Sequence, residues 1–111
     1  MEHPDLSVAV ARTDVEAVLT LTGEIDMSTA NRLSTAISEI LTAVPVPPRI
    51  VLDLRGVTFC DSQGLGTLVV LSRKADLARS CLVLVNVGDF LLRVLDITGL
   101  RAALMIQEKA A

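Results

Sequence analysis

The stretch Phe59–Gly66, "FCDSQGLG", lies between two apolar runs and holds an acid, a hydroxyl, an amide and two glycines. Before it, "IVLDL" at Ile50–Leu54 is short and rich in aliphatic residues, which predicts a buried central strand. After it, "TLVVLSRKADLA" places Leu68, Leu71 and Ala75 on one side of a predicted helix over residues 63–79. The stretch is therefore expected to be the turn between a buried strand and a helix.

The residues upstream of this turn predict a hairpin and a first helix. "LSVAVAR" (Leu6–Arg12) and "EAVLTLTG" (Glu16–Gly23) alternate in polarity, as strands with one buried face do. From Ser28 onward apolar residues recur at intervals of three and four, the spacing of a helix with one buried side. Asp26 and Ser28 are both competent helix N-caps. The prolines of "VPVPPR" (Val44–Arg49) end the helix because proline has no backbone N–H to donate.

The residues downstream of the turn predict three further elements. These are a buried strand at Cys81–Val87, a helix "FLLRVLDIT" capped by Asp89 and ended by Gly99, and a short last strand at Ala103–Gln107. Two initial strands followed by alternating helices and strands indicate an α/β layer structure with a mixed sheet. Without repeats or linkers, the chain is expected to form one unit.

The composition excludes several classes of function. The chain has 111 residues, 51% of them hydrophobic, and Phe59 and Phe90 are its only aromatic residues, so the core must be aliphatic. A net charge of −3 without a basic stripe excludes a nucleic-acid partner. No apolar run approaches the ~18 residues of a spanning helix, and the N-terminus does not resemble a secretory signal. We therefore expect a cytoplasmic protein without direct membrane insertion.

The two cysteines, Cys60 and Cys81, are predicted to be free thiols. They lie at opposite ends of predicted parallel strands, ~13–16 Å apart at ~3.3 Å per residue, too far for a disulfide. Two cysteines and the single histidine, His3, do not make a structural zinc site, so no metal is expected. Redox control through Cys60, next to Asp61, remains a hypothesis.

The two glycines of the turn have two possible explanations. Gly64 and Gly66 fall in the first turn of the predicted helix, where each costs up to about 1 kcal/mol relative to alanine. Either the helix start packs tightly against a strand, or something large approaches this backbone. Asp61 or Ser62 could cap the helix, although no Glu or Gln follows at the position of a capping box.

The motif "DSQGLGTL", preceded by "IVLDLRGVTF" and with "LTGEID" upstream, resembles the anti-sigma factor antagonists of the STAS domain family. The resemblance extends to "LLRVLDITGL" and covers nearly the whole chain. It implies a single STAS domain over residues 1–111. The implied α/β fold has a mixed sheet of four to five strands, with three to four helices packed mainly on one face.

The same resemblance implies a function by partner switching. The unphosphorylated antagonist binds an anti-sigma factor that is also a serine kinase, and so releases a sigma factor. Phosphorylation of the serine after the aspartate, here Ser62, ends the binding, and a phosphatase restores it. ATP belongs to the kinase, so no cofactor is expected in this chain. The implied partner-binding residues are Asp26, Asp61, Ser62, Gln63, Gly64, Leu65 and Gly66.

Three points remain open in this assignment. Gln63 stands where many relatives have a second hydroxyl, so Ser62 is the only phosphorylatable group of the turn. Asp26 is expected either at the partner surface or only as a helix cap. The alternative function is a non-phosphorylated STAS adaptor in a signalling or membrane-transport assembly. An enzyme is not expected, because His3, the only histidine, is remote from any motif and no acid pair has a catalytic spacing.

Overall fold

A computed structural model of the chain describes residues 5–107, which form one mixed five-stranded sheet in the order β1-β2-β3-β4-β5. The strands are β1 (Leu6–Arg12), β2 (Glu16–Ile25), β3 (Arg49–Cys60), β4 (Cys81–Val85) and β5 (Met105–Ile106). The helices are α1 (Ala30–Leu41), α2 (Ser62–Leu77), α3 (Asp89–Thr98) and the 3-10 turn η1 (Leu100–Ala103). This architecture confirms the predicted α/β class and the mixed sheet.

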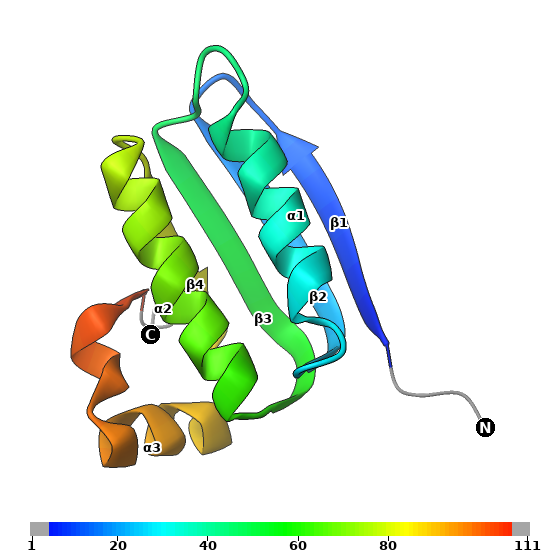
Figure 1. Cartoon of the computed structure of the whole chain (residues 1–111), viewed down its shortest axis with the longest axis vertical. Helices are drawn as coiled ribbons and strands as arrows, with labels where there is room; N and C mark the ends of the chain where they lie inside the picture. The colour runs from blue at the N-terminus through cyan, green and yellow to red at the C-terminus, as the bar shows by residue number, and fades with distance from the viewer. Residues whose placement is uncertain (1–4, 108–111) are drawn as a thin grey trace.

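The helices α1 and α2 lie side by side over one face of the sheet, and α3 crosses near one end of the molecule (Figure 1). The space between helices and sheet is filled by fully buried aliphatic side chains, among them Leu19, Leu21, Leu33, Ile37, Leu52 and Leu68. The expected aliphatic core is confirmed, and neither phenylalanine belongs to it.

The strand directions bring three loops together. β1 and β2 form an antiparallel hairpin, whereas β2, β3 and β4 run parallel, connected through α1 and α2. Because parallel strands end at the same edge of a sheet, the loops that follow them meet there, as they do in other open α/β sheets where ligands bind. The start of α1, the start of α2 and the start of α3 therefore lie at one end of the molecule (Figure 1).

The strand before the turn is longer than the sequence predicted. β3 was expected to end at Leu54, but it continues to Cys60, where it still pairs with Ile25 of β2. Two register shifts interrupt the pairing, and such shifts break the two-residue alternation by which a strand is recognised. At Gly56 an added Cβ would lie 2.8 Å from the Leu21 carbonyl oxygen, so the glycine permits a close approach of the two strands.

Two capping predictions at the third helix have different outcomes. Gly99 ends α3 in the left-handed conformation, with φ of 75°, as predicted. Asp89 is not the N-cap, because Gly88 takes that position and Asp89 is the first helical residue. The preceding strand also ends at Val85, two residues early, because Asn86 has φ of 55° and turns the chain away from the sheet.

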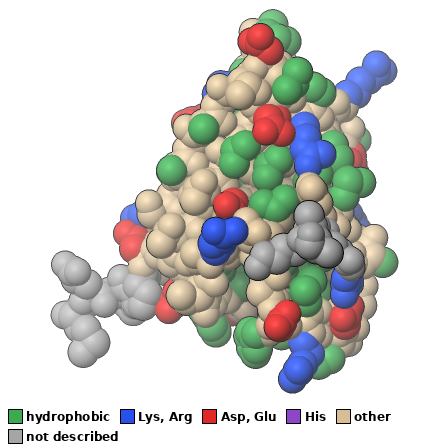
Figure 2. Space-filling model, turned by 180° about the vertical axis from the view of Figure 1, so that it is seen from behind, with side chains coloured by type: hydrophobic (Ala, Val, Ile, Leu, Met, Phe, Trp, Pro, Cys, Tyr) green, Lys and Arg blue, Asp and Glu red, His purple; other side chains and the backbone are tan. Residues whose placement is uncertain are grey.

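The opposite face of the sheet carries neither α1 nor α2. Figure 2, the view from behind, shows patches of hydrophobic side chains between acidic and basic ones. Arg49 and Glu16 form an ion pair at 3.5 Å between neighbouring strands. Among residues 5–107, no helix has both the length and the apolar character needed to cross a bilayer.

Candidate functional site

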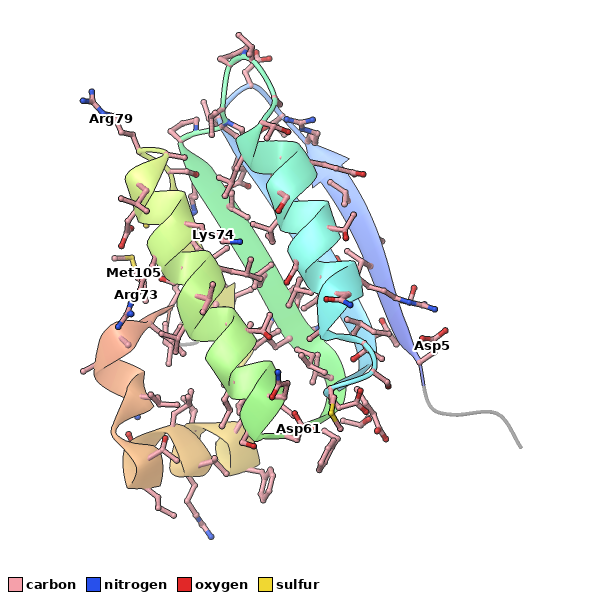
Figure 3. The ribbon with its side chains drawn as sticks, viewed as in Figure 1. Asp5, Asp61, Arg73, Lys74, Arg79 and Met105 are labelled. Atoms are coloured by element: carbon pink, nitrogen blue, oxygen red, sulfur yellow. The ribbon has the colours of Figure 1, made fainter. Side chains whose placement is uncertain are left out.

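Asp61 fixes the turn between β3 and α2. It is the N-cap of α2, and its Oδ1 accepts the backbone N–H of Gly64 at 2.8 Å. Its Oδ2 accepts the N–H of Met27 at 3.4 Å, and its own N–H donates to the carbonyl of Ile25 at 3.1 Å. Asp61 therefore joins the start of α2 to the loop between β2 and α1. Figure 3 shows its label at the lower end of the molecule, where α2 begins.

Ser62 is the first residue of α2 and is exposed, as is Gln63. Within residues 5–107, the structure gives neither side chain a hydrogen-bonding partner. The Ser62 side chain is therefore accessible, and its hydroxyl has no hydrogen bond within residues 5–107 to lose. Its neighbour Asp61 is held by hydrogen bonds with the backbone of Ile25, Met27, Gly64 and Leu65, so the backbone that presents the hydroxyl is fixed.

The two glycines of the turn have different explanations. At Gly64 an added Cβ would lie 2.5 Å from the Ile25 carbonyl oxygen and 2.8 Å from the Cys60 sulfur, so tight packing requires this glycine. At Gly66 an added Cβ would meet nothing within 4 Å. Packing thus accounts for Gly64 alone, while Gly66 leaves its exposed backbone open to approach from outside.

Asp26 organises the loop before α1. Its Oδ1 accepts the hydroxyl of Ser28 at 2.7 Å and the backbone N–H groups of Ser28 and Thr29 at 2.9 and 3.1 Å. These hydrogen bonds, that of the Ser28 hydroxyl first, lower the pKa of Asp26. Asp26 and Ser28 were the expected N-caps of α1, but neither takes that position. The chain makes one extra turn, and Thr29 is the N-cap instead.

The hydrogen bond from Met27 to Asp61 brings the Asp26 loop to the start of α2. Of the seven residues expected at the partner surface, Gly64 and Leu65 are buried, so their contribution is to hold the turn in shape. Ser62, Gln63 and Gly66 are exposed, and Asp26 and Asp61 are partly exposed. The structure therefore presents five of the seven expected residues at one end of the molecule, from two loops.

A shallow groove of about 280 Å³ lies between α1 and α2 beside the exposed hydroxyl. It is lined by Ser34, Ser62, Gln63, Gly66, Thr67 and Val70. All of these side chains are small or uncharged. The groove therefore offers an uncharged surface on which a partner could lie against Ser62.

The basic residues of α2 lie far from its first turn. Arg73 and Lys74 are exposed in the second half of the helix, and Arg79 follows its C-terminus (Figure 3). Ser62 and Arg73 are ~16 Å apart along the helix, at ~1.5 Å per residue. A negative group on Ser62 would thus meet the positive end of the helix dipole and the nearby Asp61, but none of these cations.

Cys60 precedes the turn and is poorly placed for redox chemistry. Burial, and secondarily the charge of Asp61, raise the pKa of its thiol to about 12. A thiol with such a pKa forms little of the reactive thiolate at neutral pH. Both Cys60 and Cys81 are free, as predicted. In the described part of the chain, no group of three or more His, Cys, Asp and Glu residues could hold a metal ion. His3 lies outside the described residues.

Sequence reasoning missed three exposed apolar residues at this end of the molecule. Met27, Phe59 and Phe90 are exposed by 77%, 44% and 70%. The signal that could have identified the two phenylalanines as surface residues was their rarity in a chain whose core is predicted to be aliphatic.

Comparison with known proteins agrees with this fold. The family model described as "Mlab, STAS domain" matches residues 8–107. The chain therefore belongs to the STAS domain family. Within it, the chain falls with the anti-sigma factor antagonists. It is 34% identical over 99 residues to the "Anti-sigma-B factor antagonist" of Listeria monocytogenes, covering 86% of this chain and 83% of that protein.

Two mycobacterial proteins are similarly related. The chain is 41% identical over 75 residues to the "Anti-sigma-F factor antagonist RsfB" of Mycobacterium tuberculosis, matching 67% of this chain and spanning only 60% of that protein. The crystal structure of an anti-sigma factor antagonist from Mycobacterium paratuberculosis superposes with a TM-score of 0.77. It is 31% identical, and the match covers 91% of this chain and 84% of that one.

Proposed function

We propose that this chain is a cytoplasmic single-domain switch protein that, when unphosphorylated, binds an anti-sigma factor and so frees a sigma factor. The anti-sigma factor is also a serine kinase, and its phosphorylation of Ser62 ends the binding. A serine phosphatase restores the binding form. Asp26, Asp61, Gln63, Gly64, Leu65 and Gly66 form or support the binding surface around Ser62.

The observation that carries this proposal is the contrast between Ser62 and its neighbours. Asp61 is tied to four backbone groups and Gly64 is packed against β2, whereas the Ser62 hydroxyl between them is exposed. A kinase needs a reachable hydroxyl on a backbone of defined shape. The open approach at Gly66, one helical turn further on, supports docking of a protein at the same place.

Electrostatics explains how a single phosphate would release the partner. A phosphoserine carries about −1.5 to −2 charges at neutral pH. In a docked interface this charge would be desolvated or set against like charge, at a cost of several kcal/mol. Since ~1.4 kcal/mol changes affinity tenfold, a penalty of about 3–4 kcal/mol weakens binding by two to three orders of magnitude. Dissociation then needs no refolding of this chain.

The direct test is the intact mass of the protein recovered from its own cells. The wild type is compared with Ser62→Ala and with a matched control, Thr67→Ala, whose hydroxyl lies in the next helical turn and donates to the Gln63 carbonyl at 2.9 Å. We expect a fraction heavier by one phosphate in the wild type and the Thr67→Ala form, and none in the Ser62→Ala form.

The alternative to this function is a constitutive adaptor. Absence of the phosphorylated fraction during growth, starvation and stress would overturn the switch. Stable association with a transport or signalling subunit would then be expected, and it would be the same for the wild type and Ser62→Ala.

A further inference from the structure

The only two aromatic residues of the chain line one small hollow at the surface. Phe59 is the last residue but one of β3 and Phe90 is the second residue of α3, and together with Cys60 and Leu91 they line a hollow of about 80 Å³. Phe90 is largely accessible and Phe59 is about half-exposed, whereas the core contains aliphatic side chains alone. The hollow has room for the end of one aliphatic side chain.

Phe59 and Phe90 are the aromatic members of a larger set of exposed apolar side chains, which also includes Val44, Leu77 and Ile97. Burying a large apolar side chain contributes about 1.5–3 kcal/mol. Phe90, at 70% exposed, forgoes most of this contribution, and Phe59, at 44%, forgoes part of it. Single exposed apolar residues are common on protein surfaces, but two aromatic rings around one hollow are not a random scatter. Phenylalanine and methionine are enriched in protein–protein interfaces. The hollow therefore has the composition of an interface centre.

The hollow adjoins the turn that presents Ser62. Phe59 is two residues before Asp61, and Cys60, which also lines the hollow, packs next to Gly64. Met27 is 77% exposed, and its backbone N–H donates to the Asp61 carboxylate at 3.4 Å. Phe59 therefore lies next to the turn along the chain, and Met27 belongs to the loop that is hydrogen-bonded to Asp61.

The groove is lined by residues of α1 and α2, and the hollow by residues of β3 and α3. The start of α2 lies between the start of α1 and α3 (Figure 1). No neighbouring strand of this chain closes that side of β3. β4 pairs with β3 only from Arg49 to Asp53, so the edge from Leu54 to Cys60 has no strand beside it among residues 5–107. Leu54 and Thr58 of that edge contribute to the lining. The hollow is therefore accessible to a partner that already covers Ser62.

We propose that Met27, Phe59 and Phe90 form an apolar anchor patch for the anti-sigma factor, which inserts one aliphatic side chain into the hollow between the two rings. This inference rests on the proposed function and extends its interface across the start of α2. The continuity of the hollow with the turn identifies the occupant as the protein that docks on Ser62. A stable interface buries about 800 Å² on each partner, more than a shallow groove alone supplies.

The two parts of this interface have separable roles. The patch supplies affinity in a form that does not depend on the charge at Ser62. Phosphorylation adds a penalty at the turn and leaves the patch intact. Loss of a ring should therefore weaken binding of the unphosphorylated chain without altering the phosphate's relative effect.

The test measures the affinity of the full chain for the purified kinase that phosphorylates its Ser62, with ADP bound to the kinase. The variants are Phe59→Ala, Phe90→Ala and Met27→Ala, with Leu77→Ala as control, since Leu77 is 86% exposed at the far end of α2. We expect the two phenylalanine variants to bind at least tenfold more weakly, Met27→Ala severalfold more weakly, and Leu77→Ala within twofold of wild type.

The outcomes separate the inference from the function on which it rests. Within-twofold binding of Phe90→Ala, together with loss of binding on phosphorylation of Ser62, overturns the patch and leaves the switch in place. Phe90 is 70% exposed, so Phe90→Ala should fold even if Phe59→Ala does not. If no kinase phosphorylates Ser62, the proposed function fails and the patch falls with it. Self-association that Phe90→Ala abolishes would assign the hollow to a second copy and also overturn the inference.

Discussion

At the scale of single residues, Asp61 determines how the turn between β3 and α2 is built. Its carboxylate caps α2 and holds the loop between β2 and α1, two tasks for two oxygen atoms. For the first task, the sequence offered Asp61 and Ser62 as alternative caps, and the structure shows that Asp61 is the cap. It could not predict the second, because the partner N–H belongs to Met27, which is 34 positions away.

We expect Asp61→Ala to lower the free energy of unfolding by about 1–2 kcal/mol, since loss of a helix N-cap alone costs about that much. Asp61→Asn should cost less, because an amide oxygen still accepts one of the two hydrogen bonds. The measurement is chemical denaturation, with Asp76→Ala as control, since Asp76 is exposed on the same helix. Equal stability of the Asp61→Ala and Asp76→Ala proteins would contradict the anchoring role.

The thiol of Cys60 provides a second prediction at this scale. Its pKa is raised to about 12 in the folded chain, whereas an unfolded cysteine ionises near ~8.5. The folded state therefore keeps a proton that the unfolded state loses, and stability should be fully present below about pH 8.5 and fall as the pH rises toward 12. Urea denaturation at several alkaline pH values should show this decline in Cys81→Ser and a shallower one in Cys60→Ala/Cys81→Ser.

Alkylation gives an independent check. In the Cys81→Ser background, native Cys60 should react with iodoacetamide at neutral pH much more slowly than the urea-unfolded chain does. Equal native and unfolded rates would instead revive the hypothesis of redox control through this cysteine.

At the scale of elements, the first turn of α2 contains two glycines whose substitution should have opposite effects. Gly66→Ala should stabilise the fold by up to about 1 kcal/mol, because alanine is the better helix former and the added Cβ meets nothing within 4 Å. Gly64→Ala should destabilise it by about 1–3 kcal/mol, since the Cβ would lie 2.5 Å from the Ile25 carbonyl oxygen.

Thermal and chemical denaturation of the two variants provide the comparison, and each serves as the control for the other. If Gly66→Ala stabilises the chain and also weakens anti-sigma factor binding, the open backbone serves docking. Loss of stability in Gly66→Ala would show that the helix start is more crowded than the structure indicates.

The same elements show how far sequence reasoning reaches. Regular alternation and helical spacing predicted β1, β2, α1 and α2 nearly to their ends. In β2, α1 and α2 the buried residues recur with the period of the element. These patterns failed on the second half of β3, where two register shifts and Gly56 interrupt the alternation. The predictions of the N-caps from residue type also failed at α1 and α3, where Thr29 and Gly88 take the cap position although better capping residues lie nearby. Local residue preference is a weak guide where contacts with distant parts of the chain fix the conformation of a loop.

At the scale of the whole molecule, the switch is expected to change docking and leave the fold unchanged. The Ser62 hydroxyl is exposed and has no hydrogen bond within residues 5–107 to lose, and Leu65, the first fully helical core residue, remains buried behind it. At this exposed position the helix dipole stabilises a phosphate by about 0.3–1 kcal/mol, and repulsion from Asp61 destabilises it by a similar amount. The stability of the phosphorylated chain should therefore lie within about 1 kcal/mol of the unmodified one.

Denaturation of both forms tests this expectation, with Ser62→Ala treated in the same way to control for the treatment with kinase. Amide hydrogen exchange adds local resolution, since protection at Leu65 and Leu68 should be unchanged by the phosphate. Unfolding of the first turn of α2, seen as faster exchange at Leu65, would instead mean that the phosphate destroys the binding surface. Unchanged exchange would leave charge at an intact surface as the cause of partner release. The anchor patch of Met27, Phe59 and Phe90 would then persist in both states, ready to bind again once the phosphate is removed.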